Sequence, residues 1–408
     1  MSVIQVQNEI GVLKKVLVHR PGGELLNMTP DILTELLFDD IPFLKNAQQE
    51  HDAFVRIMEE NGVEVVYLVD LVAEALDAHE GLRFQFVDQL IAEGRVSNRR
   101  YNQATNAFLK GIADSRDLVS KAIAGVNLKD IDMVDKISLN DLISDPSRLI
   151  LPPMPNLYFQ RDPMATVGNG VVINHMQTYT RSRETILAEY IFKYHPDYLD
   201  HVPQYYHRED PFTIEGGDIL NISEHVLAVG LSERTEADAI ETLAKNLFQH
   251  PECAIDTVLA FDIPKARAYM HLDTVFTQID HNLFTVHPGI LGTLRVFELT
   301  KPKRSEQGDL QIREIEDTLE NVLSHYLQRD IELILCGGGD RIAAEREQWN
   351  DGSNTFCIAP GTIIVYDRNE ITNEIFKDRG LRVIEMPSGE LSRGRGGPRC
   401  MSMPLVRE

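Results

Sequence analysis

The 408-residue sequence predicts an α/β protein that is built from repeated strand-and-helix units and interrupted by a helical insertion. Three observations support this fold class. Segments rich in β-branched residues lie near both ends of the chain, three segments look like copies of one strand–turn–helix unit, and one long stretch has apolar residues at helical spacing. Hydrophobic residues make up 43% and charged residues 25%, as in ordinary globular proteins, so the composition excludes disordered, collagen-like and disulfide-scaffold proteins.

The first part of the chain has an α/β pattern. Residues 12–21 predict a strand that Pro21 ends, residues 45–60 predict a helix, and residues 63–70 predict a second strand. From residue 71 to residue 147 the apolar residues recur at helical spacing, and glycines separate the helical segments. We therefore expect one α/β domain made of residues 1–70 and 148–408, with a helical bundle inserted at residues 71–147.

Three segments after Pro152 have the same pattern, in which a β-rich strand passes through a polar turn into an amphipathic helix. They are residues 169–191, 224–247 and 360–380. In the last two, Thr235 and Thr372 are predicted as helix N-caps. Repetition of one unit favours strand-and-helix units around a central axis. The alternative, an open doubly wound sheet, lacks a Gly-x-Gly-x-x-Gly turn after a strand.

The charge and cysteine content exclude several classes of function. A formal net charge of -23 repels polyanions, so nucleic acid and anionic membranes are poor partners, although acidity is also a common aid to solubility. No run of apolar residues approaches the length that a membrane-spanning helix needs. The cysteines are widely spaced and none has the spacing of a zinc site, so we expect no metal and a cytoplasmic protein with reduced thiols.

Cys400 differs from the other three cysteines in its surroundings. It lies in SRGRGGPRCMSMPL (392–405), which predicts a loop in which Arg393, Arg395 and Arg399 favour the nucleophilic thiolate. Cys253, Cys336 and Cys357 lie in apolar segments and are expected to be small buried hydrophobes. A solvated basic loop is the alternative for the segment around Cys400.

Four acidic or basic residues could complete a catalytic set with Cys400. His271 and Asp273 lie in an alternating segment that predicts a β-hairpin, where a spacing of two places both on one face. Asp162 and Glu215 lie among apolar residues or glycines, where an ordinary turn is the alternative. Together with Cys400 they match the combination of nucleophile, base and orienting carboxylate that is typical of covalent catalysis.

Five segments, MPNLYFQRDP, EGGDIL, MHLDTVFTQID, GGGD and GGPRCMSMPLVRE, occur in this order and closely resemble the arginine deiminases of the guanidino-group-modifying superfamily. The resemblance extends over essentially the whole chain. It implies a five-bladed α/β propeller of the pentein type, with pseudo-fivefold symmetry and an inserted helical bundle. In several related enzymes a histidine precedes the catalytic cysteine, whereas Arg399 does so here, which leaves the role of this position open.

The resemblance implies hydrolysis of free L-arginine to L-citrulline and ammonia, the first step of fermentative arginine catabolism, in which ammonia helps acid tolerance. No metal or organic cofactor is required. The implied catalytic residues are Cys400 as nucleophile, His271 as acid and base, Glu215 to orient His271, and Asp162 and Asp273 to bind the guanidinium. The implied substrate-binding residues are Arg181, Arg234 and Arg395 for the carboxylate, with Asn156 and Phe159 in the pocket wall. We also expect a homo-oligomer, a dimer or larger.

Two other functions stay open at this point. A related amidino hydrolase or transferase would act on agmatine or a methylated arginine, and it would not need arginines that bind a carboxylate. A protein that only binds arginine would need neither Cys400 nor His271.

Overall fold

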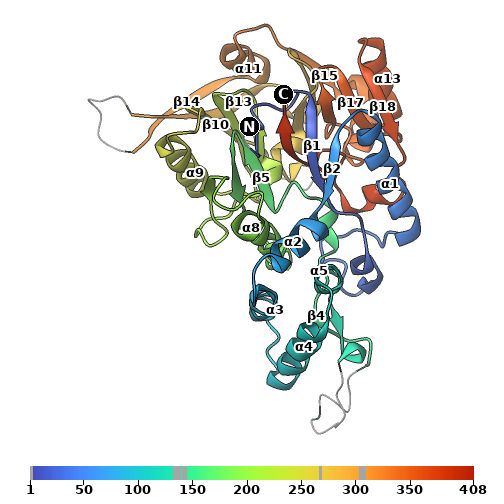
Figure 1. Ribbon diagram of the computed structural model, residues 1–408. Helices are drawn as coiled ribbons and strands as arrows, with labels where there is room; N and C mark the ends of the chain where they lie inside the picture. Colours follow the sequence, from blue (N-terminus) through green and yellow to red (C-terminus); the bar gives the residue numbers. More distant parts are fainter. Residues whose placement is uncertain (1–2, 132–138, 140–144, 266–268, 303–308) are drawn as a thin grey trace.

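The computed structural model describes residues 3–131, 139, 145–265, 269–302 and 309–408 (Figure 1). The fold is mixed α/β. In the described residues, the strands form five sheets of three or more strands and one two-stranded sheet. The first sheet has the order β19 (Met403–Arg407), β1 (Leu13–Val18) and β2 (Glu64–Tyr67), so the two ends of the chain pair with each other.

The five larger sheets share one pattern. A central strand has one antiparallel neighbour and one parallel neighbour. The other four sheets contain β5 (Met164–Val167), β6 (Gly170–Ile173) and β7 (Gln204–Tyr206); β8 (Ile219–Asn221), β9 (Val226–Leu231) and β10 (Thr257–Asp262); β11 (Phe276–Gln278), β12 (Leu283–Val286) and β15 (Glu332–Leu335); and β16 (Phe356–Ala359), β17 (Thr362–Tyr366) and β18 (Arg382–Met386). A hairpin of β13 (Thr293–Thr300) and β14 (Gln311–Thr318) extends the sheet of β8–β10.

A helix joins the central strand of each sheet to its parallel neighbour, as parallel pairing requires a crossover. These helices are α1 (Leu44–Glu60), α8 (Glu184–Tyr194), α9 (Ala237–Gln249), α11 (Leu319–Leu327) and α13 (Glu370–Asp378). The three predicted strand–turn–helix copies are confirmed as β6–α8, β9–α9 and β17–α13. Two further copies, β1–α1 and β12–α11, follow the same order, and their repetition was not recognised from the sequence.

A helical segment interrupts the order of strands after β2. It contains α2 (Leu68–Asp77), α3 (Leu82–Glu93), α4 (Arg99–Gly111) and α5 (Ser115–Ala124), and Figure 1 shows α3 and α4 extending away from the sheets. The short strands β3 (Val126–Asn127) and β4 (Leu149–Leu151) pair where the chain returns. Residues 132–138 and 140–144 of the predicted insertion lie outside the described residues.

The predicted second strand is too long. It ends at Tyr67, and α2 begins at Leu68, three residues before the predicted boundary. Leu68, Leu71 and Val72 are buried on one face of this helix, so helical spacing determines its start although the preceding residues are β-branched.

The predicted N-caps are also wrong. Thr235 lies before α9, where its hydroxyl donates to Asp218 at 2.7 Å, and Thr372 lies inside α13, where its hydroxyl donates to Glu347. Both carboxylates are buried, and a buried carboxylate requires hydrogen-bond donors. The two hydroxyls therefore satisfy tertiary acceptors instead of the helix ends.

The environments of the catalytic candidates differ from the prediction in two places. The hairpin is present as β11 and β12, but His271 precedes and Asp273 lies within α10 (Leu272–Val275), a single helical turn, so they do not alternate along a strand. The segment predicted as a loop at 392–405 contains a turn at Cys400 followed by β19, whose residues Met403 and Leu405 are fully buried. Strand pairing with β1 accounts for this order near the C-terminus.

Candidate active site

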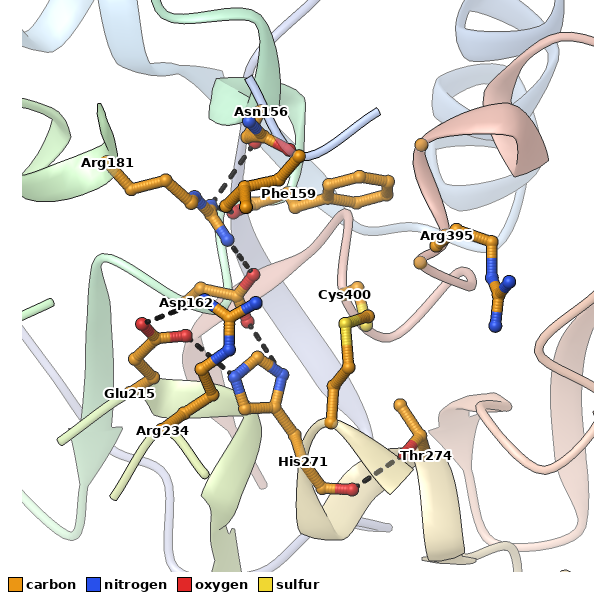
Figure 2. Close-up of a pocket in the computed structure, with 14 residues that line it drawn as sticks. Asn156, Phe159, Asp162, Arg181, Glu215, Arg234, His271, Thr274, Arg395 and Cys400 are labelled. Carbon is orange, nitrogen blue, oxygen red and sulfur yellow. Dashed lines mark hydrogen bonds and ion pairs between the residues drawn. The ribbon is translucent and has the colours of Figure 1, made fainter. Parts of the chain in front are cut away.

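A small cavity lies where the loops of several sheets meet (Figure 2). Its volume is about 30 Å³, which holds about two water molecules. Nine of the ten predicted site residues line it: Asn156, Phe159, Asp162, Arg181, Glu215, Arg234, His271, Arg395 and Cys400. The tenth, Asp273, is fully buried and contacts Cys400. The fold thus brings together residues separated by more than two hundred positions in the sequence.

His271 and Glu215 form a buried pair. The Nε2 atom of His271 lies 2.8 Å from Oε2 of Glu215, and its Nδ1 atom lies 3.7 Å from Oδ1 of Asp162. Burial alone would lower the pKa of His271, but the charges of Asp162, Glu215 and Asp218 outweigh it and raise this pKa to about 9. Burial also opposes the ionisation of Glu215, but the hydrogen bond from His271 and the nearby cations lower its pKa to about 2. The imidazole is therefore a cation at neutral pH.

The glycines of the EGGD segment are required by close contacts. A Cβ at Gly217 would lie 2.5 Å from Nδ1 of His271, and a Cβ at Gly216 would lie 2.0 Å from the carbonyl oxygen of Arg161. These glycines therefore let the backbone beside Glu215 pass directly against the imidazole and against the segment that carries Asp162. Asp218 then accepts a hydrogen bond from the backbone N–H of Leu272, which holds the turn after His271.

Asp162 and Asp273 each have one oxygen bound to an arginine. Arg181 Nη1 donates to Oδ2 of Asp162 at 2.5 Å, and Arg399 Nη1 donates to Oδ2 of Asp273 at 2.7 Å. Their Oδ1 atoms are buried and have no hydrogen-bond partner among the described residues. A buried carboxylate oxygen without a donor is costly, so Oδ1 of Asp162, a residue that lines the cavity, is suited to accept a hydrogen bond from a ligand.

Cys400 is buried, and its thiol donates to Oδ2 of Asp273 at 3.6 Å. Burial, together with the charges of Asp273, Asp162 and Asp351, raises the pKa of this thiol well above its usual range. The prediction that nearby arginines favour the thiolate is therefore wrong for the unliganded protein. The other cysteines agree in part with their prediction, since Cys336 and Cys357 are buried and Cys253 is half-buried.

The arginines of the Cys400 loop fail to activate the thiol because carboxylates hold them. Arg393 pairs with Asp40, and Arg399 donates to both oxygens of Glu9 in addition to Asp273. Arg399 also donates to the carbonyl oxygen of Ile219. The residue before Cys400 therefore binds Asp273 and is not among the residues that line the cavity.

The predicted substrate-binding residues differ in how far they are already engaged. Arg181 is buried and donates to Asp162, to Glu184 at 2.8 Å and to backbone carbonyls, so most of its donors are in use. Among the residues that the structure describes, the guanidinium of Arg234 has one ion-pair partner, Glu215 at 3.7 Å. Arg395 has a left-handed backbone, with a φ of 64°, and its guanidinium stacks 3.5 Å above the ring of Trp349.

The last two predicted residues, Asn156 and Phe159, belong to the pocket wall through different contacts. The amide of Asn156 donates to the carbonyl oxygen of Leu36 at 2.7 Å. Phe159 packs closely against the glycines of the Cys400 loop. A Cβ at Gly396 would lie 2.4 Å from its ring, so a larger residue would not fit there.

Five further residues line the cavity that sequence reasoning did not identify: Leu37, Met270, Thr274, Gly394 and Gly396. Gly394 and Gly396 flank Arg395 and were visible only as part of a glycine-rich segment. Leu37 has a φ of 64°, a conformation that no sequence signal at a leucine indicates. Within the described parts of the chain, no cluster of His, Cys, Asp or Glu side chains could hold a metal ion, and no helix is both long and apolar enough to cross a membrane.

Solved structures with the same fold come from enzymes of guanidino-group chemistry. A dimethylarginine dimethylaminohydrolase, as an adduct with S-methyl-L-thiocitrulline, matches with a TM-score of 0.51 at 16% identity over 96% of this chain and 99% of that one. An amidinotransferase from Microseira wollei matches with a TM-score of 0.54 at 15% identity over 100% and 98%. The chain therefore has the mixed α/β pentein fold, with a buried Cys–His–carboxylate site.

Sequence relatives define the family within this class. A family model described as arginine deiminase matches residues 34–407. The arginine deiminase of Treponema denticola is 58% identical over 100% of this chain and 99% of its own length, and that of Clostridium perfringens is 52% identical over 99% and 98%. The chain belongs to the arginine deiminase family.

The contact at Gly217 generates a first prediction. Gly217→Ala is expected to displace the imidazole of His271 and to lower kcat/KM for arginine by about 100-fold, because misplacing a reacting group by about 1 Å has an effect of that size. Gly111→Ala is the matched control, since a Cβ there meets no atom within 4 Å. Steady-state kinetics with a thermal melt checks the result, and full activity of the Gly217 variant would contradict the close contact.

Proposed function

We propose that this protein hydrolyses free L-arginine to L-citrulline and ammonia through a covalent adduct on Cys400, as a step of fermentative arginine catabolism in which the ammonia supports acid tolerance. Membership of the arginine deiminase family supports the reaction. The observation that carries the mechanism is that Cys400 lines the cavity together with Asp162 and contacts Asp273, and that each of these carboxylates has a buried oxygen without a hydrogen-bond partner among the described residues. A planar guanidinium supplies donors for both oxygens.

Binding of the substrate would activate the nucleophile. In the free protein the negative charges of Asp162 and Asp273 hold the thiol of Cys400 in its neutral form. A guanidinium bound to these carboxylates places a cation beside the sulfur, which lowers the thiol pKa by the same Coulombic effect with the opposite sign. The thiol would then release its proton to solvent and form the thiolate only when substrate binds, which limits side reactions of the buried cysteine.

The chemical steps use Cys400 and His271. The thiolate attacks the central guanidinium carbon and forms a C–S bond, and the protonated imidazole of His271 gives its proton to the departing ammonia as the C–N bond breaks. The neutral imidazole then takes a proton from a water molecule that attacks the same carbon. The C–S bond breaks, citrulline leaves, and the thiolate is regenerated. Glu215 stabilises the imidazolium form of His271, which is present before the first step and again after the second.

Arg234 is the best anchor for the substrate carboxylate. Its donors are less engaged than those of Arg181, whose main role would be to hold Asp162. Arg395 would bind from the opposite side of the cavity, with Asn156 and Phe159 completing the wall. Since the cavity holds only about two water molecules, arginine can enter only after the residues that cover it move apart.

A five-bladed propeller with an inserted helical bundle is the architecture that we propose for this chain. Five sheets with one repeated order support a five-bladed propeller, and helices α2–α5 support a helical bundle inserted at residues 71–147 between the two parts of the catalytic domain, residues 1–70 and 148–408. We further propose that the protein is cytoplasmic and works as a homo-oligomer without a metal or organic cofactor.

Cys400→Ser tests the covalent step directly. The variant is expected to fold, because serine has nearly the same shape, and to lose measurable turnover, because a buried hydroxyl is a far weaker nucleophile. Rapid acid quench with labelled arginine should leave label on the wild type and on the Cys253→Ser control, and none on Cys400→Ser. Label on the Cys400 variant would overturn the assignment of the nucleophile.

The raised pKa of His271 determines the alkaline side of the pH profile. Because the protonated imidazole is required, kcat/KM is expected to fall as the pH rises through about 9. Glu215→Gln removes a charge that raises this pKa, so the fall should begin at lower pH. Glu314→Gln, on the surface strand β14, is the control and should keep the wild-type profile. An unchanged alkaline limb in Glu215→Gln would exclude this pairing as its cause.

The decarboxylated substrate agmatine tests the anchor and separates this function from that of an agmatine deiminase. Loss of a charged partner in a closed site costs about 2–5 kcal/mol, which predicts a preference for arginine of about 30- to 5,000-fold in kcat/KM. Arg234→Ala should reduce this preference, while Arg313→Ala on the surface should not. Equal efficiency of the wild type on both substrates would favour an agmatine deiminase, and binding without turnover would favour a protein that only binds arginine.

A further inference from the structure

We infer that Asn354 is a positioning residue that sets the sulfur of Cys400 relative to Asp273. The inference rests on the proposed function, since it concerns how the nucleophile is aligned with a carboxylate that would bind the guanidinium. Asn354 is 1% exposed and does not line the cavity. It therefore acts through other residues and does not contact the substrate.

The side-chain amide of Asn354 joins two segments of the site. Its Oδ1 accepts a hydrogen bond from the backbone N–H of Cys400 at 3.2 Å, and its Nδ2 donates to the backbone carbonyl oxygen of Asp273 at 3.1 Å. An amide carries one acceptor and one donor group, so it can bridge a backbone N–H and a backbone C=O at the same time. Aspartate, leucine or alanine at this position would lose at least one of the two bonds.

The other side of Cys400 is held by the segment of the second carboxylate. The carbonyl oxygen of Cys400 accepts a hydrogen bond from the backbone N–H of Arg161 at 3.0 Å, and Arg161 directly precedes Asp162. The carbonyl of Cys400 is thus bonded directly to the segment that carries Asp162, and its N–H is connected to the backbone of Asp273 through the side chain of Asn354. Asn354 supplies the side-chain hydrogen bonds of this arrangement. It can be substituted without altering any group that touches the substrate.

Asn354 itself is held in a fixed place. Its backbone N–H donates to the carbonyl oxygen of Asp351 at 2.9 Å, and Asp351 has a left-handed φ of 57°. On the other side, a Cβ at Gly397 would lie 2.7 Å from Oδ1 of Asn354, so this glycine allows the Cys400 loop to pass against the amide. The close contact and the turn leave the amide little freedom to adopt another orientation.

The test separates alignment from folding and from thiol access. In Asn354→Ala, formation of the Cys400 adduct at saturating labelled arginine is expected to slow by about 100-fold, as for a misaligned nucleophile. Alkylation of Cys400 by iodoacetamide, which needs no alignment with Asp273, should stay near the wild-type rate. Asn373→Ala is the matched control, because this buried asparagine bonds Tyr366 and Glu385 through its amide and lies outside the cavity wall.

Asn354→Asp covers the case in which the alanine variant does not fold. It keeps the size and the acceptor for Cys400, loses the donor to Asp273, and adds a negative charge near the thiol. The pH dependence of alkylation should therefore shift to higher pH, and adduct formation should slow.

Three outcomes would overturn the inference. They are wild-type rates of adduct formation in Asn354→Ala, an equal slowing in Asn373→Ala, and a wild-type alkylation profile together with a wild-type adduct rate in Asn354→Asp. Failure of the wild type to form any adduct would instead overturn the proposed function, and the positioning role with it.

Discussion

The pairing of buried charges is the constraint on which the rest of the site depends. Glu215, Asp162 and Asp273 are all removed from solvent, and an ionised carboxylate is stable there only when cations and donors compensate it. Each one has such a partner in His271, Arg181 and Arg399, respectively. The compensation is incomplete at one oxygen of Asp162, which lines the cavity, and at one oxygen of Asp273, which contacts Cys400 through its other oxygen. The preference of the site for a cation therefore follows from the carboxylate oxygens that have no hydrogen-bond partner among the described residues.

The same constraint explains why so many arginines near the cavity do not lower the pKa of the nucleophile. Arg399 divides its donors between Glu9 and Asp273. Burial and the surrounding carboxylates therefore determine the pKa of the Cys400 thiol, and they raise it. In the proposed mechanism the reactivity of Cys400 depends on substrate binding, because a cation bound to these carboxylates would lower the pKa of the thiol. The cavity of about 30 Å³ limits access in a similar way, since it is far smaller than a molecule of arginine.

The repeated order of strand, helix and parallel strand places the loops that carry these groups at one point. Asp162, Glu215, His271 and Cys400 each lie in a connection next to a sheet, not in the middle of a strand. Local contacts then fix the positions of these groups. The backbone at Gly217 lies against the imidazole of His271, and the side-chain amide of Asn354 bridges the backbones of Cys400 and Asp273. The N-terminal segment contributes as well, because Glu9 holds Arg399, and β1 pairs with the strand that follows Cys400.

The sequence by itself determined the α/β class, three of the five repeated units, the helical segment after β2 and the family, because hydrophobic spacing and ordered motifs are local properties of the chain. It also identified nine of the residues that line the cavity, through the resemblance of their motifs. Only the tertiary structure decided the protonation state of Cys400, the partners of Arg399, the one-turn helix at Asp273 and the bridge made by Asn354. These features depend on burial and on contacts between segments up to several hundred residues apart, and neither is encoded in local spacing: a basic loop predicts a thiolate until the carboxylates that neutralise it are placed beside it.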